Sequence, residues 1–185
     1  GAKRPHLRAL ATLRPKSPAH QHAATDSLRE TAASGIQGLE VYVPRHCVDV
    51  AALEANNGCS SKSARDLLIE RYTACGDDED AASMALAAIR RLIHYHQVRP
   101  YEVGQLQVDS KSLLDRSKSM KSELMAMVEA DAYADVEGVD HYDASAGHAS
   151  ALLSCVSWAQ DKSWDGRWAV AVCVNDQVAP NGLPM

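Results

Sequence analysis

The stretch that most constrains the fold runs from residue 136 to residue 160 and reads VEGVDHYDASAGHASALLSCVSWAQ. Its first part carries valines around Gly138, which predicts a strand whose backbone is closely approached by a neighbour. Residues 146–158 are small and apolar and predict a buried helix. A turn at residues 142–145 joins the two. The chain therefore presents Ser145 at the start of a helix, where the helix dipole favours developing negative charge.

Strands and helices alternate along the rest of the chain. Asp80 marks the clearest helix start, because an aspartate ahead of an apolar-periodic segment caps the free N–H groups of the first turn. Predicted helices cover residues 26–33, 49–57, 80–93 and 122–132, with one or two helical turns at 65–72. Predicted strands cover residues 35–44, 105–109, 136–139 and 168–174. This order predicts an α/β domain with a mostly parallel sheet flanked by helices.

The first 33 residues differ from the rest and predict a basic extended arm. Residues 1–25 hold no acidic residue, although the net charge of the whole chain is −5. The basic residues of the arm are Lys3, Arg4, Arg8, Arg14 and Lys16. This composition is typical of a mitochondrial or plastid transit segment, and a floppy leader has the same composition. The chain begins with Gly1 and not with methionine, which fits processing of a precursor.

Prolines interrupt the arm, so we expect no regular element that it could form by itself. We expect the arm to bind a partner protein, an anionic lipid or RNA phosphate through its basic side chains. The acidic body of the chain argues against extensive RNA contact. The predicted division is therefore an arm at 1–33, bound to a partner, followed by a domain at 34–185.

Cysteine usage and hydropathy argue against several classes of protein. The five cysteines form no C-x-x-C pair, which predicts free thiols in a reducing compartment and no zinc site. Cys155 and Cys173 lie in apolar surroundings and are interpreted as inert core thiols. No segment approaches the roughly 18 apolar residues of a membrane-spanning helix. His94 and His96 are too close in sequence to share a helix face, so neither is predicted to bind a metal.

Three segments carry a family resemblance most densely: residues 114–121 (LDRSKSMK), 135–140 (DVEGVD) and 163–167 (SWDGR). Further matches are Gly35, Ile36, Leu39, Glu40, Tyr42, Val43, Pro44, Val48, Asp49, Leu53, Glu54, Lys62, Cys75, Asp77, Glu79 and Asp80. Over about residues 34–180 the chain resembles hydroxymethylglutaryl-CoA synthase, a family with the thiolase fold. The resemblance implies that two similar α/β halves pack together in the family and that this chain is the first of them. The family's substrate-binding histidine lies in the second half.

The departures from the family fall on its chemistry. The resemblance places Ser145 at the family's nucleophilic cysteine, which is acylated at the start of the central helix. A helix terminus stabilises a cysteine thiolate, whereas a serine hydroxyl needs a dedicated base. Lys111 stands at the family's acid–base glutamate and His148 at a small turn glycine, and residues 65–69 replace a glycine-rich active-site segment. We therefore expect no catalytic residue of the family type, and loss of the native synthase chemistry.

Ser145 and His148 are spaced to lie on one helix face, which raises the hypothesis of a new nucleophile–base pair. Asp143 or Asp140 would be its third member. A serine hydrolase normally takes its base from a separate element, with an oxyanion site opposite. We therefore favour the interpretation of His148 as a core or interface histidine.

These departures predict a catalytically inactive synthase-like protein that serves as an accessory structural subunit of a large mitochondrial complex. A respiratory-chain complex, ATP synthase or mitochondrial ribosome is the expected host. A half fold leaves a sheet edge and an apolar face that other subunits, or a second copy, would cover. No cofactor is expected. The functional alternatives are part of a split acyl-CoA condensing enzyme or a coenzyme A-binding module. Plastid and cytoplasm are the alternative locations.

Overall fold

The structure of the chain is a computed structural model that describes residues 11–13, 35–56, 58, 68–113, 115, 117–127, 135–143 and 146–176. Its elements are, in chain order, β1 (Ala11–Leu13), β2 (His46–Asp49), α1 (Val50–Asn56), β3 (Arg71–Ala74), α3 (Ala81–His96), η1 (Pro100–Glu102), β4 (Val103–Asp109), α4 (Met120–Met125), β5 (Asp140–His141), α5 (Gly147–Gln160) and β6 (Trp168–Cys173). None of the helices in these ranges is long and apolar enough to cross a membrane.

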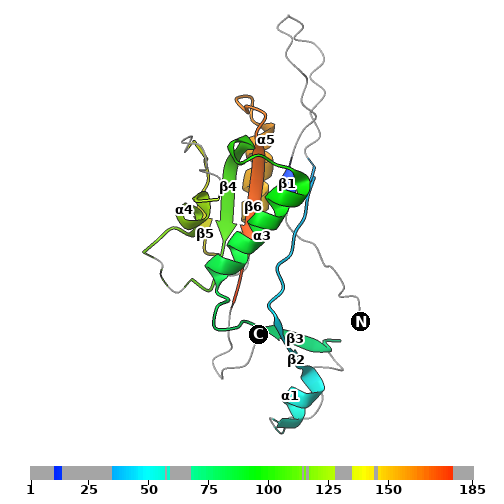
Figure 1. Ribbon diagram of the computed structural model, residues 1–185. Helices are drawn as coiled ribbons and strands as arrows, with labels where there is room; N and C mark the ends of the chain where they lie inside the picture. The colour runs from blue at the N-terminus through cyan, green and yellow to red at the C-terminus, as the bar shows by residue number, and fades with distance from the viewer. Residues whose placement is uncertain are drawn as a thin grey trace, which may run out of the picture.

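The centre of the domain is a four-stranded sheet with the order β1-β6-β4-β5 (Figure 1). Strand β4 pairs in parallel with both β6 and β5, and β1 is antiparallel to β6. All residues of β4 are buried, as expected for a strand covered on both faces. The predicted α/β fold with a mostly parallel sheet is confirmed.

Helices cover the two faces of this sheet, with α3 on one face and α5 on the other (Figure 1). Alternate side chains of β6 point to opposite faces. Val170 and Val172 join the core built with α3 and α4, whereas Ala169 and Ala171 pack with Ala151 and Cys155 of α5. The alanines let α5 approach closely, because they add little bulk between the helix and the sheet.

Residues 136–139, predicted to be a strand, lie beside β4 but form a single bridge, between Glu137 and Gln105, and the strand β5 begins only at Asp140. The backbone of this part of the chain is hydrogen-bonded to β4 from Glu137, whose N–H donates to Gly104 O at 2.9 Å, to His141, whose carbonyl accepts from Ser110 N at 3.2 Å. Gly138 has a φ of 131°, and a Cβ there would lie 1.8 Å from Leu106 O. The close backbone approach predicted at this glycine is therefore confirmed, and no other residue fits it.

The predicted start of helix α3 is also confirmed. Asp80 Oδ1 accepts a bond of 2.7 Å from Ser83 N, and Asp80 N donates to Ser83 Oγ at 2.9 Å. This reciprocal capping box satisfies backbone N–H groups that the helix leaves free. The helix ends where Gln97 adopts a left-handed conformation, with a φ of 53°.

The segment at 35–44 differs from its prediction as a buried strand. It is extended, but only Ile36 forms a bridge, and the side chains of Ile36, Leu39 and Val43 are exposed. In the described residues, this segment forms no ladder with the strands of the central sheet. A short strand, β2, forms instead after Pro44.

Two predicted helices also need correction. Residues 71 and 72, the end of the helical turns predicted at 65–72, belong to β3, which pairs antiparallel with β2 from His46 opposite Ala74. The aromatic and β-branched side chains of Tyr72 and Thr73 suit a strand. Helix α4 begins at Met120, before the predicted start at 122, because Ser119 caps it through a bond of 3.2 Å from Ser122 N. The predicted helix at 26–33, the segment at 61–67 and residues 128–134 lie outside the described residues.

The predicted arm is described only at β1. These residues pair with β6, from Ala11 opposite Ala171 to Leu13 opposite Ala169. Part of the arm therefore pairs with the chain's own sheet. The prediction had placed the whole arm on a partner. The basic residues of the arm lie outside the described residues, so their partner stays a prediction.

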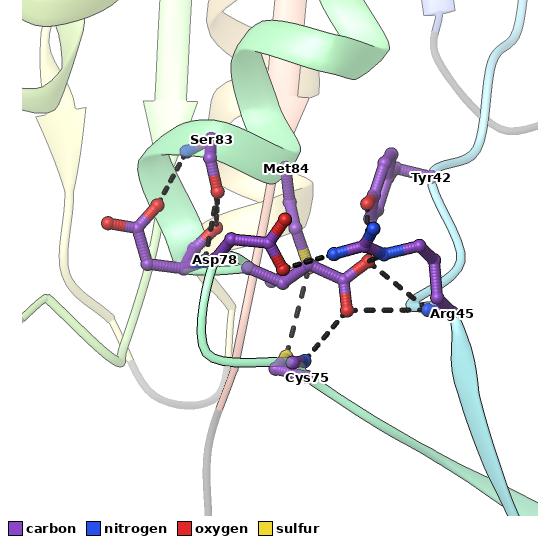
Figure 2. A network of polar contacts seen from close by, with 9 residues as sticks. Tyr42, Arg45, Cys75, Asp78, Ser83 and Met84 are labelled. Atoms are coloured by element: carbon purple, nitrogen blue, oxygen red, sulfur yellow. Dashed lines mark hydrogen bonds and ion pairs between the residues drawn. The ribbon is translucent and has the colours of Figure 1, made fainter.

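A polar junction around Glu79 connects the segment before β2 to the start of α3 (Figure 2). Tyr42 Oη donates to Glu79 Oε1 at 2.5 Å, and Gly76 N donates to Oε2 at 2.8 Å. Arg45 adds its backbone N–H, at 3.2 Å, and an ion pair with Glu79, while its guanidinium also pairs with Asp78. The Tyr42 hydroxyl, and then the Gly76 N–H, hold the pKa of Glu79 at about 2.

We expect Glu79→Gln to lower the urea midpoint of unfolding at pH 7, because it removes the charge that accepts these bonds. The pKa of Glu79 is lowered from 4.5 to about 2 on folding. Its contribution to the free energy of unfolding is therefore full above about pH 4.5, declines as the pH falls, and is lost near pH 2. The difference between wild type and variant should shrink across this window. Circular dichroism in urea at several pH values measures it.

The neighbouring exposed Asp77 provides the matched control. Asp77→Asn removes the same charge from the same turn and should leave the midpoint nearly unchanged. A difference between wild type and Glu79→Gln that stays constant from pH 6 to pH 2 would contradict the role assigned to the junction.

Candidate functional site

The candidate site lies where β4 ends and α5 begins. In open α/β sheets, ligand sites form at the carboxyl ends of parallel strands. Strand β4 ends at Asp109, and α5 starts at Gly147 after Ala146, which offers no capping side chain. Ser145 belongs to this turn in sequence but lies outside the described residues. The site is therefore built from its described neighbours.

Asp109 is the buried charge of this site, with an exposed fraction of 0%. Its backbone carbonyl accepts a bond of 3.0 Å from Val174 N, which fixes the strand end. Within the part of the chain that the structure describes, neither carboxylate oxygen accepts a hydrogen bond. Buried carboxylates are normally satisfied by hydrogen bonds, so this one is an exception that needs an explanation.

Gly147 brings the first turn of α5 directly against this carboxylate. A Cβ at residue 147 would lie 1.8 Å from Asp109 Oδ1. Any side chain there would overlap the carboxylate, so the close packing of helix and strand requires glycine. The positive end of the α5 dipole consequently faces Asp109, and it offsets part of the cost of burying the charge.

His148 provides the second compensating group. Its Nδ1 lies 3.1 Å from Asp109 Oδ2, within ion-pair distance. The histidine side chain is 49% exposed while the carboxylate is wholly buried. The imidazole thus touches the buried charge with one nitrogen and remains open to solvent. The structure places Asp109 at this position, a residue that the sequence analysis did not consider as a partner of His148 beside Asp140 and Asp143.

Lys111 lies just beyond β4, on a loop attached to the chain that follows β6. Its backbone N–H donates to Asn175 Oδ1 at 2.9 Å, and Ser112 Oγ accepts from Asp176 N at 2.9 Å. These contacts hold Lys111 near the strand end that carries Asp109. The sequence singled out Lys111, Ser145 and His148 as departures from the family. The structure brings two of them, Lys111 and His148, to the carboxyl end of β4.

Lys121 belongs, with Arg116 and Lys118, to a basic run within the family-resembling segment 114–121, and it has a structural role. Its backbone N–H donates to Asp140 Oδ1 at 2.8 Å, and its Nζ donates to Val136 O at 2.7 Å. It ties the first turn of α4 to the segment that includes β5. Arg116 of the same run lies outside the described residues.

Cys155 is buried, as predicted for a core thiol, whereas Cys173 is exposed at the end of β6, so its interpretation as a core thiol is wrong. Burial raises the pKa of Cys155 to about 12. Desolvation of the sulfur, and then the nearby Asp109 carboxylate, raises the pKa of Cys173 to about 11. Both thiols therefore stay protonated and unreactive near neutral pH. In the described ranges, no group of three or more His, Cys, Asp or Glu is placed to hold a metal ion.

The sequence reasoning missed Asp109. It ended the predicted strand at this residue and assigned it no role. The available signal was an aspartate at the end of an otherwise apolar and amide-bearing strand, a position that buries its side chain if the sheet is covered on both faces. Nothing local in the sequence indicated that His148 would lie against it.

The comparisons with known proteins agree with this architecture. The family model described as "Hydroxymethylglutaryl-coenzyme A synthase N terminal" matches residues 31–183. The human mitochondrial hydroxymethylglutaryl-CoA synthase is 34% identical over 172 residues, which cover 89% of this chain and 34% of that protein. The mouse cytoplasmic enzyme is 37% identical over 139 residues, covering 75% of this chain and 27% of its own length. The relatives thus include proteins of both compartments.

Solved structures show the same fold. MvaS in complex with 3-hydroxy-3-methylglutaryl coenzyme A matches 95% of this chain and 36% of its own chain, with a TM-score of 0.69 and 20% identity. The HMG synthase of the curacin pathway, in complex with holo donor-ACP, matches 76% of this chain and 34% of its own, with a TM-score of 0.68 and 16% identity. These likenesses confirm the predicted thiolase-like half domain. The chain spans about a third of these proteins.

We expect Gly147→Ala to destabilise the fold by about 1–3 kcal/mol or more, because the added Cβ overlaps the Asp109 carboxylate and either the helix or the strand must shift. Urea unfolding measures the change. Gly35→Ala is the matched control, since a Cβ there meets nothing within 4 Å. Adding Asp109→Ala to the Gly147→Ala variant should recover part of the lost free energy. Strictly additive effects of the two substitutions would refute the contact.

Proposed function

Because the chain belongs to the hydroxymethylglutaryl-CoA synthase family through its N-terminal part, we propose that it has lost the family's condensation chemistry and acts as an accessory structural protein. The observation that carries the proposal is the buried Asp109 carboxylate at the start of α5. The site at which the family forms its acylated cysteine adjoins this helix start. Here the chain's own carboxylate already occupies the positive end of the helix dipole.

A resting anionic nucleophile is disfavoured beside such a charge. Like charges close to each other repel, which raises the pKa of the second acid. A thiolate at this helix start would therefore be largely protonated near neutral pH. The residues Ser145 and Lys111 also argue against the family's condensation chemistry. Ser145 has no thiol that could form a thiolate, and Lys111 has no carboxylate that could act as the base.

The structural role is supported by surfaces at one side of the domain. In the described part of the chain, β5 is an edge strand of the sheet. Val139 next to it is 56% exposed, and Leu153 on α5 is 62% exposed. Unpaired strand edges and exposed apolar side chains are typical of surfaces covered by another protein. The human mitochondrial and mouse cytoplasmic relatives lie in different compartments, so they do not decide the location of this chain. We propose a mitochondrial location because the arm has the composition of a transit segment.

The loss of chemistry is tested by the reactivity of a thiol placed at residue 145. We expect Ser145→Cys, incubated with acetyl-CoA, to form no acetyl adduct at residue 145 by mass spectrometry. Its thiol should react slowly with iodoacetamide at pH 7, because Asp109 raises its pKa. Asp109→Asn in the same chain should accelerate this alkylation about tenfold or more.

The matched control is Asp140→Asn, which removes a carboxylate at the neighbouring strand end without touching Asp109. It should leave the alkylation rate of the introduced thiol nearly unchanged. Acetylation of the wild-type chain at Ser145 by acetyl-CoA, lost in Ser145→Ala, would show that acyl transfer survives and that the proposal is wrong.

The structural role is tested by the native mass of the particle that carries the chain in gentle extracts of its source. We expect a particle far heavier than the 20.0 kDa chain, and Leu153→Glu should shift a measurable share of the chain to lower mass. Tyr95→Glu, at an exposed apolar side chain of α3, is the control and should leave the particle intact. A particle of about a hundred kilodaltons with a thiolase-like second half would instead indicate a split condensing enzyme.

A further inference from the structure

We infer that the C-terminal end of α3 and the turn after it form a binding surface for single-stranded nucleic acid. This α3-end surface consists of three arginines, a histidine and two tyrosines, all of them exposed: Arg90, Arg91, Arg99, His94, Tyr95 and Tyr101. Helices α3 and α5 cover opposite faces of the sheet (Figure 1). The α3-end surface is therefore separate from the β5 and α5 side that the proposed structural function uses, and the inference goes beyond that function.

Charge sets this surface apart from the rest of the chain. Residues 81–101 contain three arginines and no acidic residue, although the whole chain has a net charge of −5. The acid that follows, Glu102, is engaged locally, because its Oε2 accepts a bond of 2.9 Å from Arg99 N. An acidic chain can bind phosphates only where a surface is free of acids and carries cations, and arginine suits phosphate well. The α3-end surface meets both conditions.

The large apolar groups exposed on this surface are aromatic rings. Tyr95 is 65% exposed and Tyr101 is 50% exposed, and within the described residues 90–102 no large aliphatic side chain is exposed. Bases of a single strand stack on exposed aromatic rings. A membrane-surface helix instead carries an apolar face that includes aliphatic side chains such as leucine. Arginines beside exposed tyrosines, without exposed aliphatic side chains, therefore favour single-stranded nucleic acid over lipid.

The turn after α3 holds one cation and one ring side by side. Val98 is buried, and its N–H donates to Ile93 O at 3.0 Å, which fixes the end of the helix. Beyond it, Arg99 Nη1 donates to Tyr101 Oη at 2.5 Å, and Arg99 Cζ lies 5.8 Å from the centroid of the Tyr101 ring. Because these two side chains are already ordered, they lose little conformational entropy when a ligand binds.

The last turns of α3 present the other members of the surface. Arg91 Cζ lies 5.2 Å from the centroid of the Tyr42 ring, which holds this guanidinium at the side of the helix. The rings of His94 and Tyr95 meet edge to face, with centroids 5.6 Å apart. Arg90 lies four residues before His94 and shares its helix face. Cations and rings thus alternate over the helix end and the turn, an arrangement that binds the phosphates and the bases of one strand together.

The experiment measures binding of a fluorescent oligouridylate of about twelve nucleotides to the full chain, by anisotropy at several salt concentrations. Each phosphate contact steepens the slope of log affinity against log salt by about 0.7, and the basic arm adds the same amount to every variant. We expect Arg90→Gln with Arg99→Gln to weaken binding about tenfold or more at low salt and to make this slope shallower by about 1.4.

Stacking has a separate readout. Tyr95→Leu with Tyr101→Leu keeps the apolar bulk but removes the rings, so it should weaken binding about tenfold and leave the salt slope unchanged. Arg90→Gln alone leaves the contact between Arg99 and Tyr101 intact and should weaken binding about fivefold. This single variant keeps the test available if the turn after α3 tolerates no substitution, and urea midpoints identify any variant that is destabilised.

Two matched controls lie elsewhere on the molecule. Lys162→Gln removes one exposed positive charge just after α5, and Tyr142→Leu removes one exposed ring just after β5. Both should leave the affinity and the salt slope nearly unchanged. A loss of affinity in the controls as large as in the α3-end variants would show that binding depends on overall charge and not on this surface.

Three results would overturn the inference. Equal affinities of wild type and both double variants would place nucleic-acid binding on the arm. An effect of the arginine variant without any effect of the tyrosine variant would indicate a surface for any polyanion, an acidic protein included. Loss of binding to phosphatidylglycerol vesicles in the arginine variant, with oligouridylate binding retained, would indicate a lipid surface.

The structural proposal is tested independently of these results. Tyr95→Glu is expected to leave the native particle intact, because the particle is held on the other side of the sheet, and it should nevertheless lower the affinity for oligouridylate. A small native particle would contradict the structural role and leave the measured affinities in place. Absence of binding to oligouridylate would contradict only the inference about the α3-end surface.

Discussion

The close approach of the first turn of α5 to the end of β4 is the constraint on which the rest of this domain depends. Gly147 permits it, because any Cβ would overlap the Asp109 carboxylate. The alanines of β6 continue the contact along the helix, so α5 lies flat against its face of the sheet. The opposite face is filled by valines and the large apolar side chains of α3 and α4. The sheet is thereby buried on both sides.

This approach also determines the chemistry that the site can support. A carboxylate enclosed between a strand end and a helix start has lost its water, and burial of an unpaired charge is costly. Here the positive end of the α5 dipole and Nδ1 of His148, 3.1 Å from Asp109 Oδ2, are the polar groups that face it. Such a site opposes a second anion and supports a neighbouring cation. The family uses an anionic thiolate at this helix start, whereas this chain has a buried carboxylate beside an imidazole. The two anions would repel each other, so one such site does not favour both.

The Glu79 junction holds a different part of the chain. The segment before β2 was predicted to be a buried strand but does not form one, and its apolar side chains at Ile36 and Val43 are exposed. Hydrogen bonds from Tyr42 and Arg45 to the buried Glu79 carboxylate, and not strand pairing, hold this segment against the start of α3. Local apolar content predicted a strand there, but a strand also needs a partner strand, and no described strand of the central sheet pairs with this segment in a ladder.

The sequence by itself determined the α/β class, the family, the capped helix α3, the small-residue helix α5 and the close contact at Gly138. These features depend on periodicity, capping and steric room, which are local properties of the chain. Only the tertiary structure decided that Asp109 and His148 meet. One ends a strand and the other begins a helix, so their contact depends on how that helix packs on the sheet, and no local pattern encodes such packing.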